Sequence, residues 1–390
     1  MTRWDAVVVG AGPAGSATAL HLARAGARVL MLDRARFPRD KPCSEYLSPE
    51  TTRVLGRLGG GVLEAVAAAS PARLTGMKVV APSGKSMTGH FDHTGERFSY
   101  ALPRTTFDTI LRRAAEQAGV VVREGVKVDA LVYDAGAVGG VVAAGETHRA
   151  RVVVGADGLR SVVARRTSGV RTSAPHRVAF TAHVADVAGI SDVGEMHVGG
   201  GGKGYVGLGP IGGGVTTVAL VLPVRALKQR ARFFEALDRF PGLVGRFDPR
   251  RMVRGLLTTG PFAQWSRRPV APGGGALLVG DAADFFDPFT GQGIYSALRG
   301  AELAAAAVSE HLASGASLRA YARARRREFA GKWVLERLIA VGVGWPALAE
   351  RVVGRLARRA DLADLLVRAT GNCVPARHVL APAVLAGLLW

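Results

Sequence analysis

Residues 5–15 read DAVVVGAGPAG, and this stretch decides how the chain begins to fold. Residues 5–9 have the uninterrupted apolar pattern of a buried strand, and residues 16–25 have the pattern of a helix. A second apolar run, at 27–32, ends at Asp33. A strand, a helix and another strand in this order predict a parallel βαβ unit.

The glycines of this stretch suit a turn that binds phosphate. Gly10 permits the tight turn, Gly12 lets the backbone approach a pyrophosphate, and Gly15 lets the helix pack closely on the strand. The start of the helix supplies unpaired N–H groups and positive potential. Asp33 lies near the spacing at which a carboxylate binds ribose hydroxyls. The predicted dinucleotide site contains Gly10, Gly12, Pro13, Ala14, Gly15, Asp33 and Arg34.

A second glycine pattern, GLGPIG at 207–212, lacks this context. It is followed by further glycines and the strand-like VTTVALVL, whereas phosphate binding requires a helix. The stretch GGGGKG at 199–204 lacks the spacing and the Ser or Thr of a phosphate loop. The sequence therefore predicts one dinucleotide site.

Two later stretches place a carboxylate just after a glycine at the end of an apolar strand. RVVVGADG at 151–158 contains Asp157, and ALLVGDAADFFDPFTGQG at 276–293 contains Asp281. In open α/β sheets, ligands bind at the carboxyl ends of the strands. Three such stretches in one chain predict a ligand site far more specifically than any one of them.

The chain resembles the large FAD-dependent family that includes the single-component aromatic hydroxylases and the geranylgeranyl reductases. The matching residues are GAGPAG with Asp33, the Gly-Ala-Asp-Gly stretch at 155–158, and Gly280-Asp281 with Pro288, Gly291, Gln292 and Gly293. The resemblance implies an FAD-dependent oxidoreductase in which Asp33 binds the adenosine ribose and Asp281 binds the ribityl chain. It also implies that Arg104, at the start of a helix, contacts FAD.

The remaining FAD-binding residues are predicted from the same resemblance. Beyond the first turn they are Arg34, Lys41, Arg104, Asp157, Asp281, Pro288, Gly291, Gly293 and Ile294. A helix that begins near Gly291 would direct its N–H groups and its dipole at the N1–C2=O edge of the flavin, where negative charge gathers on reduction. No cysteine and histidine cluster has the spacing of metal ligands, so we expect no metal.

The predicted fold is an α/β protein in which a Rossmann-like FAD-binding domain carries an inserted antiparallel β-sheet substrate domain and a C-terminal helical region. The expected regions are the FAD-binding domain at 1–75, 101–175 and 272–330, the substrate domain at 76–100 and 176–271, and the helical region at 331–390. The flavin would lie between the first two domains. The terminal VLAPAVLAGLLW is apolar enough to dock on the body or to cover an oily pocket.

Two flavin chemistries fit the sequence, and both take electrons from NAD(P)H, bound transiently or through a separate electron-donating reductase. The favoured one is a monooxygenase that hydroxylates an apolar aromatic or polyketide-like small molecule. Ser44, Glu45 and Tyr46 replace the glycine pair of the reductases, and residues 194–210 resemble oxygenases that tailor polyketides.

The alternative chemistry is reduction of C=C bonds in an isoprenoid or quinone side chain. RFPRDKPCSEYLSP at 36–49 and PFTGQGIYSAL at 288–298 resemble geranylgeranyl reductases. Halogenation is disfavoured because the Trp-x-Trp-x-Ile-Pro stretch of the tryptophan-type halogenases is absent. A binding or scaffold protein is disfavoured by the intact glycine-rich helix entry that would face the flavin.

Cys43, Lys41 and Pro288 are the candidates for the chemistry. Cys43 lies in a polar stretch bracketed by prolines, with Lys41 and Arg39 close by in the chain. A thiolate there would sit in positive potential and have a lowered pKa, which suits a proton donor or a substrate contact near the flavin. The alternative interpretation is an unreactive cysteine that fills a loop.

The composition of the chain limits the classes of partner that we expect it to bind. The chain has 51 Lys+Arg against 31 Asp+Glu, a formal net charge of +20, but the arginines accompany no nucleic-acid motif and we expect no nucleic-acid partner. A concentration of arginines at 319–327, continued beside apolar helical stretches, is interpreted either as a solvated helix face or as peripheral contact with an anionic membrane. Two distant cysteines and the lack of a secretory signal favour the cytoplasm.

Overall fold

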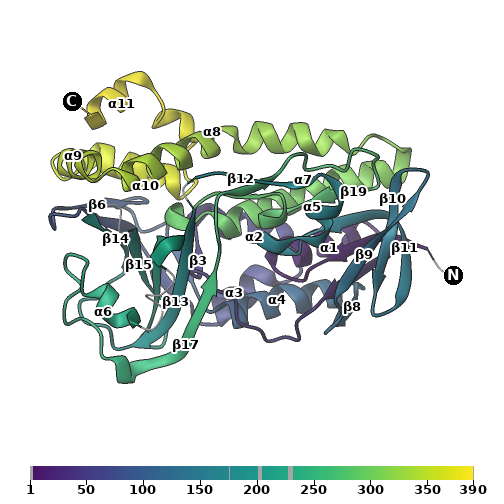
Figure 1. Ribbon diagram of the computed structural model, residues 1–390, viewed down its shortest axis with the longest axis horizontal. Helices are drawn as coiled ribbons and strands as arrows, with labels where there is room; N and C mark the ends of the chain where they lie inside the picture. The colour runs from purple at the N-terminus through teal and green to yellow at the C-terminus, as the bar shows by residue number, and fades with distance from the viewer. Residues whose placement is uncertain (1–2, 175, 201–203, 227–231, 390) are drawn as a thin grey trace.

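The computed structural model describes residues 3–174, 176–200, 204–226 and 232–389, and two seven-stranded sheets organise it (Figure 1). The first sheet has the order β8-β2-β1-β11-β10-β9, with β19 paired to β11. Its strands are β1 (Trp4–Val9), β2 (Val29–Asp33), β8 (Val121–Glu124), β9 (Val128–Asp134), β10 (Ala137–Ala143), β11 (Glu146–Gly155) and β19 (Ala276–Leu278). The strands β8, β2, β1, β11 and β19 pair with one another in parallel. The strands β9, β10 and β11 form an antiparallel meander. This parallel core confirms the predicted Rossmann-like fold.

Helices cover both faces of the first sheet because its strands are apolar on both sides. Ala6 and Val8 face one core, where α1 (Pro13–Arg24), α4 (Arg104–Gln117) and α7 (Gly293–Ser314) pack, and Val7 and Val9 face another core beside α5 (Val162–Thr167). The helix α1 begins at Pro13, three residues before the predicted start, because proline is accommodated in the first turn of a helix. Two further helices, α2 (Pro49–Leu58) and α3 (Val62–Ala68), join the first core.

The second sheet has the order β17-β13-β16-β15-β14-β5-β6. Its strands are β5 (Gly76–Val80), β6 (Ser86–His90), β13 (Arg177–Ala185), β14 (Val193–Val198), β15 (Tyr205–Pro210), β16 (Val215–Pro223) and β17 (Met252–Thr259). Every pair in this order is antiparallel except β14 with β5. The predicted antiparallel sheet thus contains one parallel pair, formed where the early hairpin of β5 and β6 joins strands from much later in the chain.

Smaller elements connect the two sheets. They are the sheet β3 (Tyr46–Leu47), β7 (Ser99–Ala101) and β4 (Ala72–Leu74), the sheet β12 (Val170–Thr172), β18 (Gln264–Ser266) and β20 (Asp284–Phe285), and the helix α6 (Phe233–Leu237). The GLGPIG stretch at 207–212 ends β15 and turns into β16 without a helix, so it forms no second dinucleotide turn. Of GGGGKG at 199–204, residues 201–203 lie outside the described residues.

The C-terminal region is helical, with α8 (Arg319–Gly344), α9 (Pro346–Leu356), α10 (Ala360–Thr370) and α11 (Pro382–Leu389). Figure 1 shows α9, α10 and α11 beside the β6 and β14 end of the second sheet, and α9 and α10 contact β6. The expected boundary between residues 330 and 331 lies inside α8, which continues from the first domain to the second. None of the helices in the described ranges is long and apolar enough to cross a membrane.

Candidate active site

A cavity of ≈ 570 Å³, called the cofactor cavity below, lies at the carboxyl ends of β1, β2, β11 and β19. Its position is the one that open α/β sheets use for ligands. The predicted FAD-binding residues that line it are Gly10, Gly12, Pro13, Ala14, Asp33, Arg34, Lys41, Arg104, Asp157, Asp281, Pro288, Gly291, Gly293 and Ile294. The candidate catalytic residue Cys43 lines it as well. Residues from five separate parts of the chain therefore meet in one cavity.

Two glycines shape the floor of the cofactor cavity. Gly10 has φ +100°, and a Cβ atom there would lie 2.5 Å from the carbonyl oxygen of Ala156. A Cβ atom on Gly15 would lie 1.8 Å from the carbonyl oxygen of Gly10. Gly15 therefore acts beneath the cavity, where it lets α1 pack against the turn after β1.

Each of the predicted carboxylates is held by a different partner. Asp33 accepts hydrogen bonds from the backbone N–H groups of Ala11, at 2.7 Å, and Ala35, at 2.8 Å. Asp281 Oδ2 lies 3.4 Å from Lys41 Nζ. These contacts fix two acidic groups on the cavity wall.

Asp157 is the predicted carboxylate with an unused oxygen. Its Oδ2 accepts a hydrogen bond of 2.6 Å from the Val162 N–H, whereas its Oδ1 is buried without a partner in the structure. Burial raises the pKa of Asp157, and its hydrogen bonds oppose that shift in part. An orphaned acceptor on the cavity wall suits a ligand that donates hydrogen bonds.

Arg104 lies at the first position of α4, as the sequence predicts, but its guanidinium is engaged by protein. Its Nε and Nη2 each donate to Asp108, at 2.7 Å, and Arg39 Nη2 lies 3.1 Å from the same carboxylate. Burial lowers the pKa of Arg104, while Asp108 and Cys43 raise it, and the net shift is upward. Arg104 thus forms a charged wall of the cavity that also faces Cys43.

The loop at residues 40–46, called the cysteine loop below, is held by a residue that the sequence did not single out. Glu45 is fully buried with φ 61°, and its Oε2 lies 2.5 Å from His183 Nε2 on β13. Its Oε1 accepts hydrogen bonds from the Arg104 N–H, at 3.1 Å, and from Arg254 on β17, at 3.4 Å. Glu45 therefore ties the cysteine loop to two strands of the second sheet and to the start of α4, and it fixes where Cys43 and Lys41 lie.

A second missed cluster anchors the turn at Pro288–Thr290. The Tyr205 hydroxyl donates to Asp287 Oδ1 at 2.6 Å, and Arg177 Nη1 donates to Asp287 Oδ2 at 2.7 Å. Burial raises the pKa of Tyr205 well above its usual value, and Asp287 adds to the effect. The phenol therefore stays protonated and holds Asp287, whose place directly before Pro288 is the signal in the sequence that could have found it.

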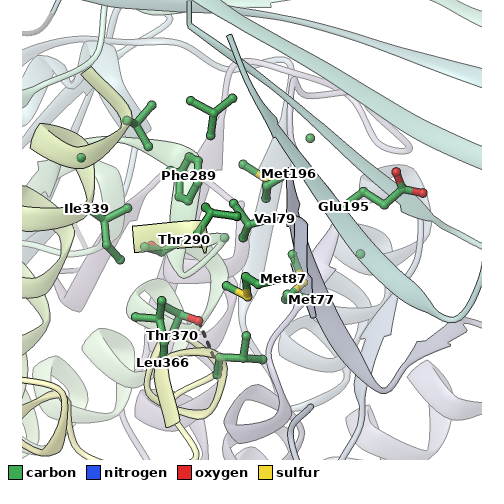
Figure 2. A pocket seen from close by; sticks show the side chains of 18 of the residues that line it. Met77, Val79, Met87, Glu195, Met196, Phe289, Thr290, Ile339, Leu366 and Thr370 are labelled. Carbon is green, nitrogen blue, oxygen red and sulfur yellow. Dashed lines mark hydrogen bonds between the residues drawn. The ribbon is translucent and has the colours of Figure 1, made fainter. Parts of the chain in front are cut away.

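A second cavity, of ≈ 340 Å³ and called the apolar cavity below, lies between the second sheet and the C-terminal helices. Figure 2 shows aliphatic and thioether side chains pointing into it from both sides. The residues that line it include Met77, Val79, Met87 and Met196 from the sheet and Leu335, Ile339 and Leu366 from the helices. Glu195 lies at its edge, but Figure 2 shows its carboxylate turned away, where it pairs with His197 and Arg246 at 2.7 Å each.

The two cavities meet at a set of shared residues, called the junction below. Its members are Ser44, Tyr46, Met196, Gly207, Pro288 and Gly291. Gly291 has φ +66°, and a Cβ atom there would lie 2.8 Å from Tyr46 Cδ1, so the tyrosine ring lies against this glycine. Val379, Leu385 and Leu388 of the terminal apolar stretch line the apolar cavity, and they cover the oily pocket that the sequence suggested.

The glycine-lined floor, the converging carboxylates and the orphaned Asp157 oxygen fit a dinucleotide such as FAD. The FAD binding domain family matches residues 3–336 of the chain. The chain belongs to this family. It is an FAD-dependent flavoenzyme, and the resemblance drawn from the three sequence stretches is confirmed.

Two proteins of known name are similar in sequence to the flavoenzyme over most of its length. It is 32% identical over 398 residues to a menaquinone reductase of Mycolicibacterium smegmatis, a match that covers 96% of this chain and 92% of the relative. It is 30% identical over 342 residues to digeranylgeranylglycerophospholipid reductase 1 of Methanococcoides burtonii, with 84% and 80% covered.

Solved structures share the fold of the flavoenzyme. The flavin-dependent brominase Bmp2 superposes with a TM-score of 0.82 at 20% identity, over 99% of each chain. A geranylgeranyl bacteriochlorophyll reductase-like protein from Thermoplasma acidophilum superposes with a TM-score of 0.73 at 23% identity, over 100% of this chain and 96% of that one. Proteins that are named for different activities therefore share this architecture, and the residues of the site must distinguish them.

Proposed function

We propose that this flavoenzyme reduces carbon–carbon double bonds in an isoprenoid or quinone side chain. The apolar cavity and its junction with the cofactor cavity carry the proposal. An isoprenoid chain has only apolar surface to offer, and its burial contributes about 25 cal/mol per Å². The two relatives described above are named as a menaquinone reductase and a digeranylgeranylglycerophospholipid reductase, which supports this ranking over the hydroxylation that the sequence alone favours.

Saturating a double bond requires a hydride for one carbon and a proton for the other. Reduced FAD, when bound, supplies the hydride, and NAD(P)H is the proposed source of its electrons. The protein must then supply the proton from the wall of the cavity. Cys43 is the proposed donor because it lines the cofactor cavity on a loop that Glu45 holds in place.

Other residues orient the reactants. Asp157 and Asp281 are proposed to bind hydroxyl groups of FAD. The N-terminus of α7 lines the cofactor cavity at Gly293 and Ile294, where its N–H groups would stabilise negative charge on a bound flavin. The apolar side chains beyond Tyr46 hold the substrate chain and exclude water from the reacting bond.

Hydroxylation of an apolar aromatic or polyketide-like molecule is the second candidate, and one observation favours it. Tyr46, one of the three residues that replace the glycine pair of the resembling reductases, lies at the junction, and its ring lies against Gly291. This bulk narrows the path of a long chain beside the flavin and offers an aromatic surface to a ring-shaped substrate.

One experiment separates the two chemistries. The purified, FAD-loaded protein is given NADH or NADPH with a short-chain prenylated quinone or with an aromatic polyketide, with and without oxygen. The proposal predicts a product that gains two hydrogens in the absence of oxygen. Incorporation of labelled oxygen from O₂ into the aromatic substrate, without saturation of the quinone side chain, would establish hydroxylation instead.

Replacing Cys43 tests the proton donor. Cys43→Ser keeps the size of the side chain but raises its pKa, so reduction of the substrate should slow at least about tenfold. FAD content and oxidation of the electron donor should remain intact. A full rate of substrate reduction in this variant would remove Cys43 from the chemistry, and hydroxylation would predict that full rate for the aromatic substrate.

A further inference from the structure

The C-terminal end of α8 exposes a stripe of large apolar side chains. Val334, Leu338, Val341 and Trp345 are 47%, 46%, 57% and 60% exposed, respectively. Their spacing of four and three residues places Val334, Leu338 and Val341 on one face of the helix, and Trp345 follows directly after its last residue. A contiguous exposed apolar face of this kind marks an interaction site.

The same face of α8 becomes basic toward the start of the helix. Arg323 and Arg327 lie eleven and seven residues before Val334, which is the same helical face, and both are exposed. The two acidic residues of α8 are engaged elsewhere: Glu328 accepts a hydrogen bond of 2.9 Å from Arg299, and Glu336 accepts one of 2.6 Å from Lys332. The exposed face thus combines positive charge with apolar side chains and carries no opposing carboxylate from its own helix.

The apolar cavity opens onto this face. Leu338 and Val341 are exposed on the outer surface, and both also line the cavity. A side chain that belongs to the surface and to the cavity wall marks the mouth of that cavity. An apolar molecule that lay against the stripe would therefore enter the cavity without crossing water.

We propose that the face of α8 formed by Arg323, Arg327, Val334, Leu338, Val341 and Trp345, called the α8 face below, docks on the surface of an anionic lipid bilayer. The apolar side chains enter the boundary between headgroups and acyl chains, and the arginines contact anionic headgroups. The entry of substrate from the bilayer through the cavity mouth rests on the proposed function, whereas the docking itself does not.

Charge favours a bilayer over a second copy of the chain as the occupant. The chain has a formal net charge of +20, so two copies brought together at the α8 face would repel each other. Like charges in contact cost free energy, whereas an anionic surface attracts each arginine.

Vesicle flotation with the full-length, FAD-loaded protein tests the docking. The vesicles contain phosphatidylcholine alone or phosphatidylcholine with phosphatidylglycerol. We expect binding to the anionic vesicles that weakens with salt. Arg323→Gln with Arg327→Gln should weaken binding at least about tenfold, because each arginine near an anionic surface contributes roughly a fivefold change.

The apolar part of the face is tested by Val334→Glu with Trp345→Glu. Neither residue lines the apolar cavity, so this variant should lose vesicle binding at least about tenfold and still turn over a short-chain substrate in solution. Val253→Glu is the matched control, because Val253 is 61% exposed on β17 and Figure 1 shows β17 on the edge of the molecule opposite α8. This control should bind vesicles like the original protein.

Two outcomes would overturn the inference: vesicle binding unchanged in both double variants, or loss of binding equal to theirs in Val253→Glu. Dimers in light scattering that the Val334 and Trp345 substitutions dissolve would assign the face to a second copy instead. Vesicle binding needs no substrate, so its failure beside intact double-bond reduction would leave the proposed function standing. Intact vesicle binding without double-bond reduction would support the docking and contradict the proposed function.

Discussion

The cofactor cavity and the apolar cavity meet at the junction, yet they are built on opposite physical terms. The cofactor cavity is made of glycines, backbone N–H groups and paired charges at strand ends. The apolar cavity is made of interchangeable aliphatic and thioether side chains from a sheet and four helices. The first offers a ligand placed polar groups and charge, and the second offers volume and apolar area. Single atoms should therefore matter in the first, and total volume in the second.

The largest expected effect comes from one methyl group beneath the cofactor cavity. Gly15→Ala would place a Cβ atom 1.8 Å from the Gly10 carbonyl oxygen, so α1 must move away from the turn. We expect the protein to lose FAD and to melt at a much lower temperature. Gly354→Ala is the control, because a Cβ atom there meets nothing within 4 Å, and alanine inside a helix is expected to stabilise by about 0.5–1 kcal/mol. Equal FAD content in both variants would contradict the comparison.

A smaller effect is expected from a single charge on the wall of the same cavity. Asp281→Ala removes the partner of Lys41 and the predicted acceptor for hydroxyl groups of FAD. Hydrogen bonds to charged groups contribute about 1.5–3 kcal/mol, so FAD affinity should fall roughly tenfold to a hundredfold in a fluorescence titration. Asp129→Ala, at an exposed site that pairs with Lys127, should leave the affinity unchanged.

A substitution at the junction should affect the substrate and leave FAD binding intact. Gly207 lines both cavities, and a Cβ atom there would lie 3.2 Å from Met196 Sδ, so Gly207→Leu should fill the passage between them. We expect kcat/KM for the substrate to fall about tenfold while FAD affinity changes little. Gly255→Leu on β17, where a Cβ atom meets nothing within 4 Å, is the matched control. A loss of FAD in the Gly207 variant would show that the two cavities are not separable in this way.

The smallest expected effect is a pH-dependent change in the protein without cofactor. Burial raises the folded-state pKa of Asp157 above its ordinary value of 3.8, so its protonated form is the one that favours folding. Its contribution is fully present below that ordinary pKa and is lost as pH rises through the raised one. Asp157→Asn should therefore raise the melting temperature by a few degrees at pH 7 and by less at acid pH. A larger gain at acid pH would refute the sign.

The cofactor side of the fold was largely predictable from the sequence. Its signals are local, because a strand, a turn glycine and a carboxylate stand next to one another in the chain around Gly10, Asp157 and Asp281. The predicted helix near Gly291 begins at Gly293, since Gly291 itself adopts φ +66° after the turn at Pro288–Thr290. Proximity in sequence was enough to identify each of these stretches as a strand that ends in a ligand-binding turn.

The rest depended on contacts between distant parts of the chain. Nothing near Glu45 indicates that it meets His183, and nothing near Asp287 indicates that it meets Tyr205. The sequence of β5 does not indicate which strand it joins, so its parallel pairing with β14 was missed. The apolar cavity had no signature for the same reason, because its methionines and leucines would suit any core.

The unbroken course of α8 decides where this chain can be recombined with its relatives. Near its start, the Tyr321 hydroxyl bonds the Leu278 carbonyl at 2.7 Å, and near its end Leu335 and Ile339 line the apolar cavity. A chimaera joined at residue 330 would divide α8. The half of the helix that lines the apolar cavity would come from the relative, and the half that packs on the first sheet would come from this chain. A crossover after Gly344, at the break before Pro346, would instead exchange α9, α10 and α11 together and keep α8 whole. The exchanged α10 would have to offer Gln292, at the start of α7, the carbonyl groups that Ala369 and Thr370 offer here. Much of the helical wall of the apolar cavity can thus be exchanged between relatives while both sheets keep their own residues.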